Sequence, residues 1–235
     1  MKRLKLTSRC AAGLLLLGGL LAWSGTEREP RDVSEQELQR IQLECLKAYP
    51  RDLVKEMTEG GTRLPAALEK TPDEVWGNLA PVTMKKGEFF PAVLQEILPM
   101  LTRQVTPGQK FLDLGSGDGR VVFLANLLGA DAYGIEYEKD LVDASLRAQG
   151  ALSDLVEPRR AHFLKGDFFE FPWSEYDVIF YFNLSSSDQG RVLRKLASEM
   201  RPNARLIVAS SPAALEGFDV VDQGGGVSVF RKAVK

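Results

Sequence analysis

The sequence has few cysteines and histidines, and this scarcity excludes several kinds of site. Its 235 residues include two cysteines, Cys10 and Cys45, and one histidine, His162. Two cysteines cannot build a disulfide framework, and their spacing fits no zinc site. The lone histidine falls inside a predicted strand, so a Ser-His-Asp hydrolase triad is not expected. The core must therefore be held by packing, and we predict no metal site.

The chain also lacks an excess of charge of either sign. Its formal net charge is −2 at pH 7. Proteins that bind nucleic acid usually present a basic footprint to the phosphate backbone. The basic pairs at 85–86 and 159–160 are short, which is typical of solvated surface. The composition therefore gives no clear indication of nucleic-acid binding.

An apolar run near the start of the sequence is too short to span a bilayer comfortably. Several basic residues precede an uncharged run from Ala11 to Trp23. Spanning takes roughly 20 residues, whereas a basic start followed by about 7–15 apolar residues is the build of a secretory signal. We expect residues 1–24 to be a signal peptide or a membrane anchor, with membrane association through residues 11–23. The sequence leaves cleavage open.

The remainder divides into a polar stretch and a regularly patterned domain. Residues 25–86 are predicted to be a linker and helical extension, with a helix over 34–49 that begins at a capping box of Ser34 and Glu37. Residues 87–235 are predicted to form one domain. Its helices are expected at 91–101, 120–128, 139–149 and 189–200, and its strands at 110–114, 131–136, 161–164, 176–183, 205–210, 218–221 and 227–231.

Strands that alternate with helices indicate an α/β fold with a mainly parallel sheet. The three glycines at 224–226 would join the last two strands as a hairpin. We therefore predict a Rossmann-like, seven-stranded, mainly parallel sheet with a C-terminal antiparallel hairpin, preceded by the helical extension. Ligands of such sheets bind beyond the carboxyl ends of the strands.

A glycine-rich turn follows the first of the regular strands. Residues 113–119 read DLGSGDG, and Gly115 and Gly117 allow the backbone to turn sharply and to approach a ligand closely. Glu136 ends the next strand, about 20 residues on, where a carboxylate can accept hydrogen bonds from a ribose diol. The pattern predicts a cofactor that contains adenosine.

Charge separates the two cofactors that fit this pattern. The dinucleotide fingerprint needs a small residue at its sixth position, and Arg120 stands there. Asp113 and Asp118 would repel a pyrophosphate, whereas Asp113 lies within reach of a cationic amino-acid group. We therefore favour S-adenosylmethionine (SAM) over NAD.

The third strand ends in Gly166-Asp167-Phe168. In this fold that position lies against the nucleobase, where an aspartate can accept from the exocyclic amine and an aromatic ring can stack. Asp167 would otherwise cap a turn, and Phe168 would otherwise belong to the core.

These motifs together resemble class I SAM-dependent methyltransferases. A longer match, comprising Lys86–Pro91, Pro107–Gly117 and Val178–Asn183, resembles the non-SET histone-lysine methyltransferase family. A similar glycine turn occurs in mitochondrial lysine methyltransferases that follow a hydrophobic N-terminal segment. The family has two consecutive asparagines after the fourth strand, where this sequence has Phe182-Asn183.

The resemblance implies SAM contacts from Glu88, Glu136, Asp167 and Phe168, with the loop that carries Glu88 lying over the cofactor as a lid. Methyl transfer to an amine nitrogen is expected, with a protein lysine favoured. The alternatives are methylation of a small molecule or lipid, and a non-catalytic module that binds SAM. Asn183 would either orient the acceptor amine or cap the following helix. Because SAM is made in the cytoplasm, a catalytic domain on the cytoplasmic side is expected.

Overall fold

The computed structural model describes residues 31–49, 82–84, 87–89, 91–182, 189–209 and 214–233, with 82–84 and 87–89 described as backbone only. Five α-helices lie within these ranges, together with two short 3-10 helices. The helices are α1 (Glu35–Lys47), α5 (Leu94–Gln104), α6 (Arg120–Leu127), α7 (Lys139–Ala151) and α8 (Gln189–Glu199), with η1 (Pro158–Arg160) and η2 (Phe168–Glu170).

The strands form a small hairpin and one large sheet. The hairpin pairs β1 (Val82–Met84) with β2 (Gly87–Phe89). The seven-stranded sheet has the order β5-β4-β3-β6-β7-β9-β8, in which the first five strands are parallel and the last two antiparallel. Its strands are β3 (Lys110–Leu114), β4 (Asp131–Glu136), β5 (Ala161–Lys165), β6 (Val178–Phe182), β7 (Arg205–Ala209), β8 (Phe218–Gly224) and β9 (Val227–Lys232).

The predicted fold is confirmed. Every helix and strand expected in the regular domain is present, with bounds that differ from the expected ones by at most three residues at either end. Chain order reverses between β3 and β6, since β4 and β5 lie on one side of β3 and β7 lies beyond β6. Ligands in open α/β sheets bind at such a switch point, outside the carboxyl ends of the strands.

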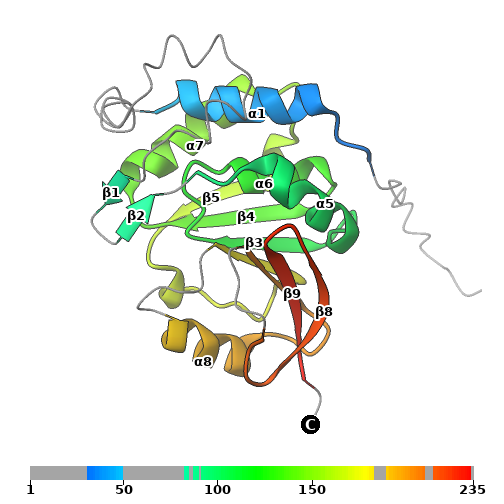
Figure 1. Cartoon of the computed structure of the whole chain (residues 1–235). Coiled ribbons are helices and arrows are strands. Elements are labelled where there is room, and N and C mark those ends of the chain that lie inside the picture. The colour runs from blue at the N-terminus through cyan, green and yellow to red at the C-terminus, as the bar shows by residue number, and fades with distance from the viewer. Residues whose placement is uncertain are drawn as a thin grey trace, which may run out of the picture.

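Alternate residues of the central strands face two separate cores. Phe111 and Phe180 point toward α5, α6 and α7 on one face, whereas Leu112 and Ile179 point toward α8 on the other, where they pack with Val192. Figure 1 shows α8 below the sheet and the other four helices above it. This alternation follows from the period of two along a strand.

The N-terminal helix α1 forms a second layer over α6 and α7 (Figure 1). It begins at the predicted capping box, in which Ser34 and Glu37 exchange hydrogen bonds. Its apolar side, which includes Ile41 and Cys45, joins the same core cluster as the helices beneath it. As a result α6, covered by the sheet below and by α1 above, is buried along its whole length.

None of the helices within the described ranges is long and apolar enough to cross a membrane. The apolar run at residues 11–23, on which the signal or anchor prediction depends, lies outside those ranges.

Candidate cofactor site

The glycine turn connects the end of β3 to the start of α6. Gly115, Gly117 and Gly119 all have positive φ angles, of 76°, 56° and 80°. The N–H groups of Gly115 and Ser116 donate to the carbonyl oxygen of Ile135 on β4 at 2.9 and 3.1 Å. The turn is therefore attached to the neighbouring strand and opens at the carboxyl edge of the sheet.

Glu136, at the end of β4, holds the middle of this turn. Its carboxylate accepts the N–H of Gly117 at 2.9 Å and the N–H of Glu138 at 2.8 Å. Burial raises the pKa of Glu136, while these backbone hydrogen bonds act in the opposite direction. A carboxylate oriented in this way retains lone pairs that can accept from a ligand hydroxyl.

Asp113 is a buried carboxylate without a protein partner among the described residues. It is 3% exposed, and within that part of the chain no group donates a hydrogen bond to it and no cation pairs with it. Burial raises its pKa well above the usual range, and the nearby carboxylates of Glu136 and Asp118 raise it further. An uncompensated buried acid is costly, and a cationic ligand group would relieve that cost.

Asp118 differs from Asp113 because its charge is neutralised within the protein. The guanidinium of Arg120 lies on it, with Nε at 2.9 Å from Oδ1, and both side chains are 2% exposed. Arg120 therefore offsets the charge with which Asp118 was expected to repel a pyrophosphate. Asp113 and Glu136, by contrast, have no cation paired with them among the described residues.

The segment that contains these residues matches a known family. Residues 113–212, which run from Asp113 past the end of β7, match the family described as the ANTKMT methyltransferase domain. This chain carries a class I SAM-dependent methyltransferase domain.

Several solved structures are similar to this chain. A mutant of MtNAS has a TM-score of 0.50 at 16% identity, covering 85% of this chain and 75% of that chain. At this identity the likeness shows the fold alone. An RNA methyltransferase from Salinibacter ruber, in complex with S-adenosyl-L-homocysteine, has a TM-score of 0.48 at 27% identity over 60% of this chain and 92% of that one.

A third structure, the magnesium protoporphyrin IX methyltransferase from Synechocystis PCC 6803 with bound SAM, has a TM-score of 0.47 at 18% identity and covers 58% of this chain and 76% of that one. No curated protein matches the sequence of this chain.

Asp167 and Phe168 of the methyltransferase domain both have structural roles. Asp167 caps η2 by accepting the N–H of Phe169 at 3.1 Å. Phe168 is partly buried against Trp173 and Tyr181, with ring centroids 6.1 Å away in each case. The two residues nevertheless follow β5 at the carboxyl edge of the sheet, so their contact with the nucleobase stays a prediction.

Two predicted site residues are incompletely described: the structure describes only the backbone of Glu88, and Asn183 lies outside the described residues. Glu88 was expected in a loop, and this is wrong: it lies in β2 and pairs with Thr83 across the hairpin. Its side chain lies outside what the structure describes, so the lid role stays a prediction. Asn183 directly follows β6 and lies outside the described residues.

Two tyrosines near the turn were not identified from the sequence. Tyr137 follows Glu136 at the sheet edge and is 39% exposed, which is unusual for a large aromatic side chain. Its position directly after Glu136, the acid predicted to contact a ribose, was the available signal. Tyr49 donates a hydrogen bond to the carboxylate of Asp118, and no local pattern connects two residues so far apart in the chain.

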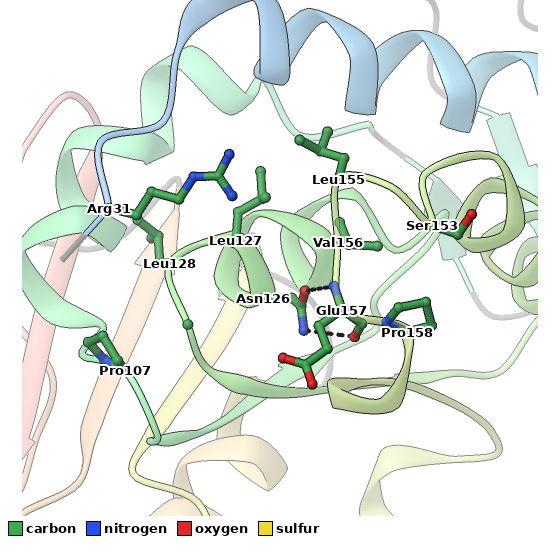
Figure 2. A pocket seen from close by; sticks show the side chains of 11 residues that line it. Arg31, Pro107, Asn126, Leu127, Leu128, Ser153, Leu155, Val156, Glu157 and Pro158 are labelled. Carbon is green, nitrogen blue, oxygen red and sulfur yellow. Dashed lines mark hydrogen bonds between the residues drawn. The ribbon is translucent and has the colours of Figure 1, made fainter. Parts of the chain in front are cut away.

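A hollow of about 350 Å³ lies away from the cofactor site (Figure 2). It is lined by residues that precede β3, β4 and β5, and hence lies at the amino edge of the sheet. Asn126 and Glu157 exchange two hydrogen bonds in its wall, at 2.8 and 3.3 Å. Because the glycine turn lies at the opposite edge, this hollow is separate from the candidate cofactor site.

Proposed function

We propose that the domain transfers a methyl group from SAM to an amine nitrogen, and that the acceptor is a lysine side chain of a protein. The main support for SAM as the cofactor is the buried carboxylate of Asp113 beside the glycine turn, which has no partner among the described residues. SAM presents an ammonium group and a positively charged sulfur, so an acidic site suits it better than it suits a pyrophosphate.

The residues of the turn have distinct roles in this proposal. Asp113 would bind the ammonium group of the cofactor, and Glu136 would accept from the ribose hydroxyls while it remains bonded to Gly117. Asp167 and Phe168 would contact the base. A Cβ added to Gly115 would meet no described atom within 4 Å, so there is open space in which the cofactor can approach the backbone of this residue.

The assignment of lysine as the methyl acceptor is supported by a sequence resemblance. The motifs at 86–91, 107–117 and 178–183 resemble the non-SET lysine methyltransferase family, and that family is consistent with the ANTKMT methyltransferase match.

The chemistry places modest demands on the protein. SAM supplies a methyl group on a sulfur that is already activated as a leaving group by its positive charge. The residues at the carboxyl edge must align the acceptor nitrogen with that methyl group and exclude water, and such alignment supplies much of the rate. The acceptor amine loses its proton before attack, and solvent can take it.

The proposal is tested with the full chain and methyl-labelled SAM. Purified protein is incubated with a cell lysate, and the label is followed into protein, lipid and small-molecule fractions. We expect label in protein, with methylated lysine after complete hydrolysis. Glu136→Ala serves as the control that should lose the label, and Asp140→Asn, an exposed acid on α7, should keep it.

Each other result contradicts part of the proposal. Label in lipid or small molecules would identify a different acceptor and overturn the lysine assignment. Label in protein on residues other than lysine would do the same. SAM binding without label in any fraction would indicate a non-catalytic SAM-binding module.

A further inference from the structure

The end of α1 is joined to the glycine turn by a buried polar network. The hydroxyl of Tyr49 donates to Oδ2 of Asp118 and accepts from the guanidinium of Arg120 at 3.0 Å. Arg120 also bonds Asp118 and donates to the carbonyl oxygen of Ala92 at 3.1 Å. All four residues are buried. The network therefore connects three segments, namely the end of α1, the start of α5 and the turn.

Tyr49 acts here as a donor. Burial raises the pKa of its hydroxyl well above the usual value, and the carboxylate of Asp118 raises it further. The hydroxyl therefore keeps its proton and donates a hydrogen bond to the carboxylate of Asp118. The same hydroxyl oxygen accepts from Arg120, so both of its hydrogen-bonding functions are used.

The other side of the turn is held by separate elements. Glu136 of β4 accepts the N–H of Gly117, and Ser145 of α7 donates to the carbonyl oxygen of Gly117 at 3.3 Å. Asp118, the next residue, is held by Tyr49 and Arg120. The peptide groups around Gly117 are therefore oriented from two directions, and on the Asp118 side Tyr49, from the end of α1, acts together with Arg120 of α6.

We propose that Tyr49 is a positioning residue for the cofactor site, acting through Asp118 and Arg120 to hold the glycine turn in its SAM-binding geometry. Arg120 alone neutralises the charge of Asp118, so Tyr49 is not needed for that. Its contribution is orientation, since a fully connected buried network specifies one geometry. The cofactor site is therefore complete only when α1 is docked. This inference rests on SAM binding at the turn.

The test compares SAM affinity with thermal stability in four full-length proteins: the wild type, Tyr49→Phe, Arg120→Lys and Ile41→Val. Tyr49→Phe keeps the buried ring and removes only the hydroxyl. Arg120→Lys keeps the charge but loses the planar fork that reaches Tyr49 and Ala92 together. Ile41→Val is the matched control, because Ile41 is a fully buried residue of α1 that lies in the apolar core.

We expect Tyr49→Phe and Arg120→Lys to weaken SAM binding by roughly 3- to 10-fold in calorimetry well below the melting temperature, about the effect of one lost hydrogen bond. Ile41→Val should lower the melting temperature and leave SAM affinity within about twofold, since the apolar side chain of Ile41 takes no part in the polar network.

Two results would overturn the inference. If Tyr49→Phe and Arg120→Lys lower the melting temperature as the control does and bind SAM like the wild type, the network is purely structural. If the wild type itself does not bind SAM, the cofactor assignment fails, and the inference fails with it. The wild-type measurement distinguishes these cases.

Discussion

The carboxylate of Glu136 accepts a hydrogen bond of 2.9 Å from the backbone N–H of Gly117, so the acid that ends β4 is bonded to the middle of the glycine turn that follows β3. The bond fixes the carboxylate at the carboxyl edge of the sheet. A residue in this position shapes the turn and, in the proposed function, would also contact the ligand.

Removing that carboxylate should weaken SAM binding. Glu136→Ala is expected to cost about 1–3 kcal/mol of binding free energy, because both the ligand hydroxyls and the Gly117 N–H lose their acceptor. Isothermal titration with SAM measures this, with Asp140→Asn as a surface control. An unchanged affinity for Glu136→Ala would remove Glu136 from the site.

SAM binding should depend on pH through Asp113. The pKa of this carboxyl is raised in the free protein, and a cationic ligand group favours the ionised form, so binding releases a proton. Affinity should therefore fall as pH is lowered below the raised pKa, by up to about tenfold per pH unit for one linked proton. Titrations over a pH series measure the slope, and Asp113→Asn should flatten it. An equal slope in both proteins would contradict the assignment.

The same carboxyl should reduce the stability of the SAM-free protein. Because the folded-state pKa of Asp113 lies above its unfolded value of about 3.9, the folded state binds more protons between the two values. The stability that the protonated Asp113 carboxyl contributes to the folded state is thus lost as pH rises through that window. Asp113→Asn, which cannot ionise, should raise the melting temperature at neutral pH while it weakens SAM binding. If Asp113→Asn lowers both the melting temperature and the SAM affinity, Asp113 has a structural role.

Two glycines of the turn should respond differently to alanine. A Cβ on Gly119 would lie 2.4 Å from Cε1 of Phe163, whereas a Cβ on Gly115 would meet no described atom within 4 Å. Both have positive φ, so each substitution carries strain of about 1–2 kcal/mol. Gly119→Ala should lose about 1–3 kcal/mol more through overpacking, and Gly115→Ala should chiefly weaken SAM binding. Thermal melts and SAM titrations separate the effects; equal melting temperatures would contradict the packing argument.

The sequence of the N-terminal segment predicts the cellular location of the protein. Because basic residues precede the apolar run from Ala11 to Trp23, we propose that the full-length chain fractionates with membranes or loses this segment during export. Cell fractionation followed by mass spectrometry of the intact protein distinguishes the two. Recovery of the uncleaved chain wholly in the cytosol would refute both.

Local pattern alone determined the secondary structure and much of the cofactor site. The bounds of β3 and β4 were predicted to the residue, since an apolar run flanked by turn residues is a local signal. The capping box of Ser34 and Glu37 was predicted for the same reason. Strand and turn order placed Asp113, Gly117 and Glu136 at one edge, because parallel strands end together.

The tertiary structure decided which charges remain unpaired. From the sequence, both Asp113 and Asp118 were expected to repel a pyrophosphate, but Arg120 and Tyr49 bond Asp118 whereas no described residue pairs with Asp113. Tyr49 lies 69 positions before Asp118, and such a contact forms only when α1 packs over α6. Long-range packing carries no local period, so only the folded chain reveals it.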